Sequence, residues 1–144
     1  MHIERSHTIT VPLPIARAFP LFTPKGEMEW VDGWAPDFLH PANGETQAGM
    51  VFTTAADGVT TLWACTDWSP DAHRVRYVRV TPGNRFGFVE VHCTAEGQST
   101  RVEVGYQFTA LSPEGEAYLA ELTPSAFTDM IEEWKRLIIE KIAA

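Results

Sequence analysis

Tyr77 and Tyr106 are the polar side chains of this sequence best suited to chemistry, because each lies in a strand-like segment. A tyrosine hydroxyl in a pocket can orient a ligand or donate a hydrogen bond to a developing oxyanion. The alternative is a buried tyrosine bonded to a neighbouring backbone carbonyl. Arg79 is a third candidate polar group for the same pocket. The residue types leave both interpretations of the tyrosines open.

The sequence holds five tryptophans, Trp30, Trp34, Trp63, Trp68 and Trp134, which is many for 144 residues. Indole combines a large apolar area with an N–H group that needs a partner when it is buried, so flat apolar ligands stack well on it. Each tryptophan can instead be an ordinary core residue. Trp30 and Trp34 are the better ligand-binding candidates, because they lie in an irregular segment that would border the mouth of a pocket.

His92 and Glu90 share one face of a predicted strand, where a carboxylate beside an imidazole could form a general base. The opposite face carries Val89, Val91 and Cys93, which make the better core. We therefore expect His92 and Glu90 to face solvent on the convex side of a sheet.

Two further groups have ordinary structural interpretations. Cys65 shares a predicted strand face with Trp63 and Asp67 and has no adjacent base, so it is expected to be a packing cysteine. Glu27 and Glu29 could place a carboxylate at the rim of a pocket, but an exposed acidic loop is the default expectation for both.

The histidines show no spacing that is typical of metal sites. None of the five is paired at i, i+4 or as HxH, and no cysteine or carboxylate stands beside them at ligand spacing. We therefore expect no metal and no other cofactor.

Composition excludes several classes of protein. A content of 44% hydrophobic and 21% charged residues is typical of a globular chain, and 144 residues fit one domain over residues 1–144. The formal net charge of −8 disfavours nucleic acid as a partner. Arg74, Arg76, Arg79 and Arg85 cluster, but the valines between them indicate strand-edge charges. No segment could span a bilayer and no signal peptide is seen, so the expected location is cytoplasmic, and a homodimer stays open.

The periodicities predict an α+β arrangement of strands followed by a long helix. Residues 3–11 alternate as a half-buried strand, Pro14 begins a short helix through Leu21, and the stretch up to Gly49 is irregular. Five more strands are predicted at residues 50–54, 60–68, 75–80, 86–93 and 100–110. An amphipathic helix over residues 113–143 closes the chain, and Pro124 should kink or split it near residues 122–123.

The chain resembles the START-like, helix-grip superfamily, also called SRPBCC or polyketide cyclase/dehydrase-like. The resemblance is carried by HTITVPLPIARAFPLFTP at the start, WACTDWSP at residues 63–70, YVRVTPG at residues 77–83 and FTDMIEEWKRLI at residues 127–138. It implies a curved antiparallel sheet of about six to seven strands wrapped around the C-terminal helix, with short helices after the first strand. The most similar subgroup is bacterial and largely without assigned function. Fold membership therefore says little about activity.

A cavity between the sheet and the final helix is the expected site. Its candidate lining residues are Trp30, Trp34, Trp63, Tyr77, Arg79, Tyr106, Phe127, Met130 and Trp134. This set is mostly apolar, which favours binding of a small apolar or aromatic molecule, lipid-like or polyketide-like. One alternative is a cofactor-independent cyclase, dehydratase or hydrolase acting on such a molecule. Another is a protein-interaction module of the chaperone-activator type.

Overall fold

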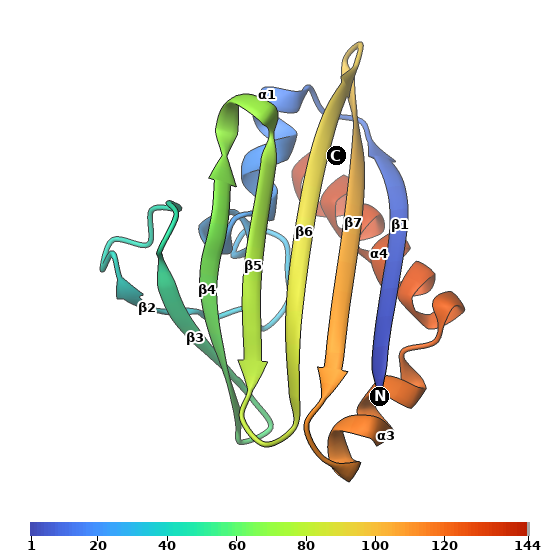
Figure 1. The fold of residues 1–144 in the computed structure, drawn as a ribbon. Coiled ribbons are helices and arrows are strands. Elements are labelled where there is room, and N and C mark those ends of the chain that lie inside the picture. The colour runs from blue at the N-terminus through green and yellow to red at the C-terminus, as the bar shows by residue number, and fades with distance from the viewer. Residues whose placement is uncertain (144) are drawn as a thin grey trace.

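The computed structural model describes residues 1–143 and is built around one antiparallel sheet of seven strands (Figure 1). The strands follow the order β1-β7-β6-β5-β4-β3-β2, so the first strand of the chain pairs with the last. Their bounds are β1 His2–Val11, β2 Asp37–His40, β3 Val51–Ala56, β4 Val59–Ser69, β5 Arg74–Thr81, β6 Arg85–Glu96 and β7 Ser99–Ala110.

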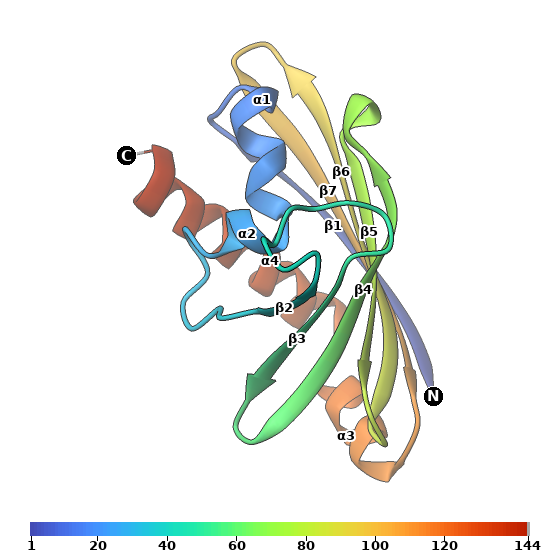
Figure 2. The same cartoon turned by 90° about the vertical axis from the view of Figure 1, so that its left-hand side faces the viewer.

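The main helices cover the concave face of this sheet (Figure 2). Their bounds, with those of the shorter helical turns, are α1 Ile15–Ala18, η1 Phe19–Phe22, α2 Pro24–Glu27, η2 Pro70–Ala72, α3 Pro113–Glu121, α4 Pro124–Ile138 and η3 Ile139–Ala143. Together with the sheet they confirm the predicted α+β helix-grip fold. Within residues 1–143, no helix is both long enough and apolar enough to cross a membrane.

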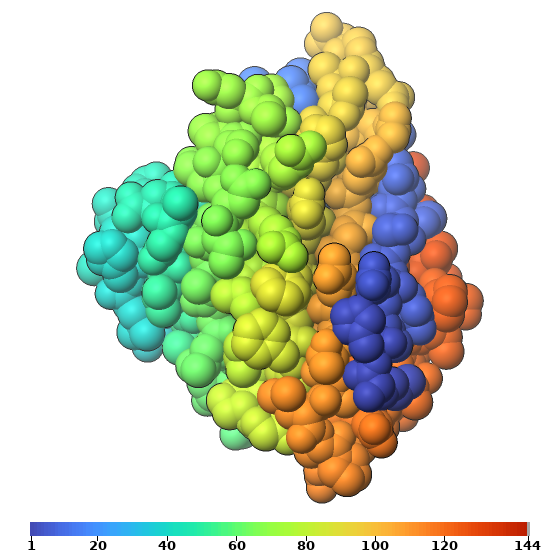
Figure 3. Space-filling view, viewed as in Figure 1, coloured from blue at the N-terminus to red at the C-terminus, as the bar shows by residue number. Residues whose placement is uncertain are grey.

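Alternation along each strand decides which side chains face the helices. In β6, Val89, Val91 and Cys93 are buried, whereas Glu90 and His92 between them are half-buried on the other side. Successive side chains of a strand point to opposite faces, so one register gives a dry face and a wet face. Figure 3 looks onto the wet, convex face, which the strands themselves form.

Helix α4 covers the concave face with an apolar side that includes Phe127, Ile131 and Ile138, each at most 1% exposed. It packs against the edge strand β1. Across this contact His7 Nε2 lies 2.7 Å from Glu132 Oε2. The helix is thereby held along one side of the sheet rather than over its centre.

The closing helical segment is split as predicted. It breaks between Glu121 and Pro124, because a proline lacks the N–H that would continue the helical hydrogen bonds. The Thr123 hydroxyl accepts the N–H of Ala126 at 3.2 Å and caps the start of α4. The break lets α3 and α4 follow different directions along the sheet (Figure 1).

Two expectations about the strands are corrected. The stretch before Gly49 is more regular than predicted, since it holds α2 and the edge strand β2. Strand β2 has only four residues between Pro36 and Pro41, which is too short a run to show a recognisable alternation in the sequence. Asp67 does not share a face with Cys65, because a bulge in β4 shifts the register between them.

The four clustered arginines are not strand-edge charges. They lie on β5 and β6, and each of these strands is paired on both sides. Arg74 and Arg76 lie on the convex face, where both pair with Glu90. Arg79 and Arg85 alternate to the concave face and line a cavity there.

A glycine lets α3 approach the turn between β5 and β6. A Cβ atom at Gly115 would lie 1.9 Å from the carbonyl oxygen of Asn84. The same oxygen accepts the N–H of Leu111 at 2.8 Å. This contact holds α3 where Tyr118 stacks on Arg85, with the Arg85 Cζ 3.4 Å from the ring centroid.

Truncating Phe127 to alanine should destabilise the protein by about 3–5 kcal/mol, because the ring is almost fully buried between α4 and Tyr106. Asp129→Ala on the exposed side of α4 is the control and should change the free energy of unfolding by no more than about 0.5 kcal/mol. Urea denaturation measures both. Equal effects of the two substitutions would contradict this packing of α4.

Candidate functional site

A cavity of about 620 Å³ lies on the concave side of the sheet. Strands β3 to β7 form its floor, the segment from Pro24 to Ala35 forms one wall, and Tyr118 and Trp134 approach from α3 and α4. The β3–β4 hairpin around Asp57 contributes to its border. Its volume is within the range of about 300–1,000 Å³ that is common for small-molecule sites.

Aromatic rings form the apolar part of the cavity. Phe52 and Trp63 stack with ring centroids 5.4 Å apart, and Trp34 meets Trp63 edge-on at 5.7 Å. The indole N–H groups are already used, since Trp63 donates to Thr54 Oγ1 at 3.0 Å and Trp34 donates to the Pro24 carbonyl at 2.8 Å. These walls therefore offer ring faces and edges rather than free donors.

Glu27 brings a carboxyl group into this apolar space. Helix α2 starts at Pro24, with Thr23 as its cap, and its last residue is Glu27, which lines the cavity. Burial raises the pKa of Glu27 from 4.5 to about 8, and the opposing charge of Arg79 lowers it only in part. Near neutral pH the carboxyl is therefore mostly protonated and can donate a hydrogen bond.

Tyr77 has a structural partner. Its hydroxyl donates to the backbone carbonyl of Phe22 at 3.0 Å and so ties η1 to strand β5. Burial raises the pKa of Tyr77 well above 10, and the nearby Glu27 adds to this. The alternative of a buried tyrosine bonded to a backbone carbonyl thus describes Tyr77.

Tyr106 and Arg79 form the polar end of the cavity with Glu27. Burial raises the pKa of Tyr106 to about 12, although the charge of Arg79 opposes this. The Arg79 guanidinium stacks over the Trp63 ring, with Cζ 4.5 Å from the centroid. A carboxyl, a phenol and a guanidinium therefore converge beside an aromatic wall, which is the usual composition of a site that binds and orients a small molecule.

The structure brings together six of the nine residues predicted to line the cavity, namely Trp34, Trp63, Tyr77, Arg79, Tyr106 and Trp134. The other three contribute to the packing around it. Trp30 is 1% exposed and donates to the Leu21 carbonyl at 2.8 Å. Phe127 packs on Tyr106, and Met130 is partly buried against the core. Whether the lining residues contact a ligand stays a prediction.

The sequence predicts an exposed loop at Glu27. It does not indicate that Arg85 and Tyr118 line the cavity. A short helix that contains Glu27 is indicated by the sequence, because Thr23 followed by Pro24 is a typical start of a helix. Only the docking of that helix on the sheet turns Glu27 inward. Arg85 and Tyr118 meet through the contact between α3 and the β5–β6 turn, which no local pattern indicates.

The remaining reactive groups have no role in this cavity. Burial raises the pKa of the Cys65 thiol to about 11, as expected for a packing cysteine. His92 lies on the convex face, with Nδ1 3.7 Å from Glu103 Oε2. In residues 1–143, no three His, Cys, Asp or Glu side chains gather in a way that could hold a metal ion.

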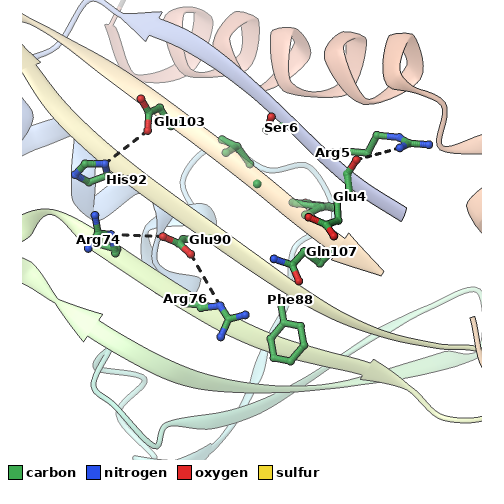
Figure 4. Close-up of a pocket in the computed structure, with 13 residues that line it drawn as sticks. Glu4, Arg5, Ser6, Arg74, Arg76, Phe88, Glu90, His92, Glu103 and Gln107 are labelled. Carbon is green, nitrogen blue, oxygen red and sulfur yellow. Dashed lines mark hydrogen bonds and ion pairs between the residues drawn. The ribbon is translucent and has the colours of Figure 1, made fainter. Parts of the chain in front are cut away.

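A second hollow of about 400 Å³ lies on the convex face (Figure 4). Charged side chains line it, and most are paired with one another. Glu90 lies between Arg74 and Arg76, at 3.4 and 3.9 Å (Figure 4). Because its charges are largely satisfied by the chain and open to water, this hollow is a weaker candidate than the aromatic cavity.

Comparisons with known proteins agree with this architecture. A model of the family described as polyketide cyclase / dehydrase and lipid transport matches residues 2–137, whereas no curated protein matches the chain. Norcoclaurine synthase from Thalictrum flavum is similar in structure, with a TM-score of 0.67 and 11% identity over 97% of this chain and 88% of that one. A hypothetical protein from Helicobacter pylori gives a TM-score of 0.72 and 13% identity, over 96% and 88% of the two chains. The Mll3558 protein from Rhizobium loti gives a TM-score of 0.65 and 20% identity, over 94% of this chain and 96% of that one. At these identities the likenesses show the fold alone.

Replacing Glu27 by glutamine should stabilise the protein increasingly as the pH rises. The unfolded wild-type chain loses the Glu27 proton near pH 4.5, whereas the folded chain keeps it to about pH 8. Between these values the folded state binds more protons, so the wild-type free energy of unfolding falls by about 1.4 kcal/mol per pH unit from this group. The Glu27→Gln variant has no ionisable group at this position and therefore does not show this fall in the free energy of unfolding.

Urea denaturation across this pH range measures the difference between Glu27→Gln and wild type. The difference should grow up to about pH 8 and then level off. Glu29→Gln is the control against which the difference for Glu27→Gln is compared, since Glu29 is exposed on the same segment. A flat difference for Glu27→Gln would show that Glu27 is solvated.

Proposed function

Because the chain belongs to the polyketide cyclase / dehydrase and lipid transport family, we propose that it binds a small apolar or aromatic molecule in the concave cavity. The observation that carries the proposal is the cavity itself, about 620 Å³ lined by stacked aromatic rings with a few polar groups at one end. Burial of apolar surface would supply the affinity, and the polar groups would orient the ligand.

Relatives of the same fold support an aromatic ligand. Norcoclaurine synthase from Thalictrum flavum has been solved in complex with dopamine and hydroxybenzaldehyde, both of which are aromatic. In our chain, Trp34, Phe52 and Trp63 would provide the surfaces on which such rings stack. Ring pairs in offset or edge-on geometry contribute about 0.5–1.5 kcal/mol beyond the burial of their area.

Glu27 favours a second role, as a general acid. Its carboxyl group holds a proton near neutral pH and faces the same space as Tyr106 and Arg79. In a dehydration it could give this proton to the leaving hydroxyl group, which departs as water, and the Glu27 carboxylate so formed could take up the α proton as the carbon–carbon double bond forms. Conversion of an aromatic β-hydroxyketone to its conjugated enone, slowed about 100-fold or more in Glu27→Gln, would support this role, and equal rates in the two proteins would exclude it.

Binding is tested with N-phenyl-1-naphthylamine, a neutral fluorescent probe. It should bind with micromolar affinity and quench tryptophan emission, because Trp34, Trp63 and Trp134 line the cavity. Val89→Phe would fill the cavity from β6 and should weaken binding at least about tenfold, since less apolar surface could then be buried.

Val78→Phe is the matched control, because Val78 lies on β5 but faces the convex side. It should leave the affinity for the probe unchanged. Equal losses in the two variants, or binding that Val89→Phe does not weaken, would contradict the proposed site. Circular dichroism spectra of both variants should match that of the wild type, which would show that they are folded.

A further inference from the structure

Two arginine side chains in the cavity have no carboxylate partner. Arg79 and Arg85 extend from the neighbouring strands β5 and β6. In residues 1–143 the Nε atom of each is buried and has no hydrogen-bond partner. The ion pairs of the same residues include neither side chain. A buried donor without a partner is costly, so such groups need an explanation.

Aromatic rings hold the two guanidinium groups in place. Arg79 stacks over Trp63, and Arg85 stacks over Tyr118, with Cζ to centroid distances of 4.5 and 3.4 Å. Both also lie against the ring of Phe108, at 5.4 and 5.9 Å. One ring thus brings the two cations to the same part of the cavity. A planar guanidinium can stack in this way and still offer its N–H edge to an oxyanion.

The two charges repel each other, and the protein does little to balance them. Burial lowers the pKa of Arg85, Tyr118 raises it in part, and the charge of Arg79 lowers it again. The carboxyl group that faces them, Glu27, is mostly protonated near neutral pH. Asp57 lies at the exposed tip of the β3–β4 hairpin. This part of the cavity therefore carries an excess of positive charge in an environment of low polarity.

Strand β5 provides an internal comparison. Arg76, on the convex side, stacks over Phe88 with Cζ 4.3 Å from the ring centroid, much as Arg79 stacks over Trp63. The chain supplies Arg76 with a carboxylate, Glu90, at 3.9 Å (Figure 4). Inside the cavity Arg79 makes no such ion pair within residues 1–143, and the carboxyl group that its charge acts on, Glu27, is mostly protonated near neutral pH.

We propose that the cavity selects a molecule with an apolar or aromatic body and a carboxylate head, and that Arg79 and Arg85 bind the head. The proposal rests on the proposed binding function and specifies its ligand class. Charge-assisted hydrogen bonds to the carboxylate would satisfy the buried Nε donors and reduce the repulsion between the two cations. The body would lie on Phe52, Trp63 and Trp34.

The test compares 2-naphthoate with 2-acetonaphthone, a neutral ketone of nearly the same shape. Both dissociation constants are measured by calorimetry at pH 7. We expect wild type to bind 2-naphthoate at least about tenfold more tightly, because hydrogen bonds to charged groups are the stronger ones. Arg79→Gln should weaken 2-naphthoate about tenfold or more and change 2-acetonaphthone less than about threefold.

Arg76→Gln is the matched control and should alter neither affinity, since Arg76 lies on the other face of the same strand. Arg85→Gln repeats the test if Arg79→Gln does not fold, and the wild-type comparison requires no variant. Equal wild-type affinities for the two compounds would overturn the carboxylate proposal and leave the binding function standing. Failure of both compounds to bind wild type would overturn the two proposals together.

Discussion

The concave face of the sheet must be kept from water, and this chain covers it from both of its ends. Helix α4 packs along β1, while α1 packs against β6 and β7. The hydrogen bond from the buried Tyr77 hydroxyl to the Phe22 carbonyl fixes the N-terminal turns to the middle of the sheet. Between these two covering segments a cavity remains over β3 to β7. The sheet forms the walls of this cavity, and the packing of the N-terminal and C-terminal helices determines which polar groups face it.

Charged side chains have different environments on the two faces of the sheet, because only the convex face is exposed to solvent. On the convex face the chain pairs Arg74 and Arg76 with Glu90, in water, where such pairs contribute little to stability. In the cavity a charge loses its hydration, so Glu27 holds its proton. The guanidinium of Arg79 instead stacks on Trp63. The resulting site is apolar along most of its length and polar at one end.

Much of the fold follows from local sequence patterns, whereas the burial of individual side chains does not. Period-two alternation predicts the longer strands, and Pro124 predicts the break between α3 and α4. Glu27 could not be placed in the same way, because its burial depends on α2 docking against a sheet formed by distant segments. The bulge in β4 has a similar effect, since one extra residue moves Asp67 to the convex face.

The central claim is that ligands bind in the concave cavity, and four of the five indole groups can report on it. Trp34, Trp63 and Trp134 line the cavity, whereas Trp68 stacks on Phe19 outside it. Indole ¹H–¹⁵N signals are recorded by NMR while an aromatic ligand is titrated. We predict that the three cavity signals shift and that the Trp68 signal stays in place. Shifts limited to Trp68 or to backbone amides of the convex face would contradict the account.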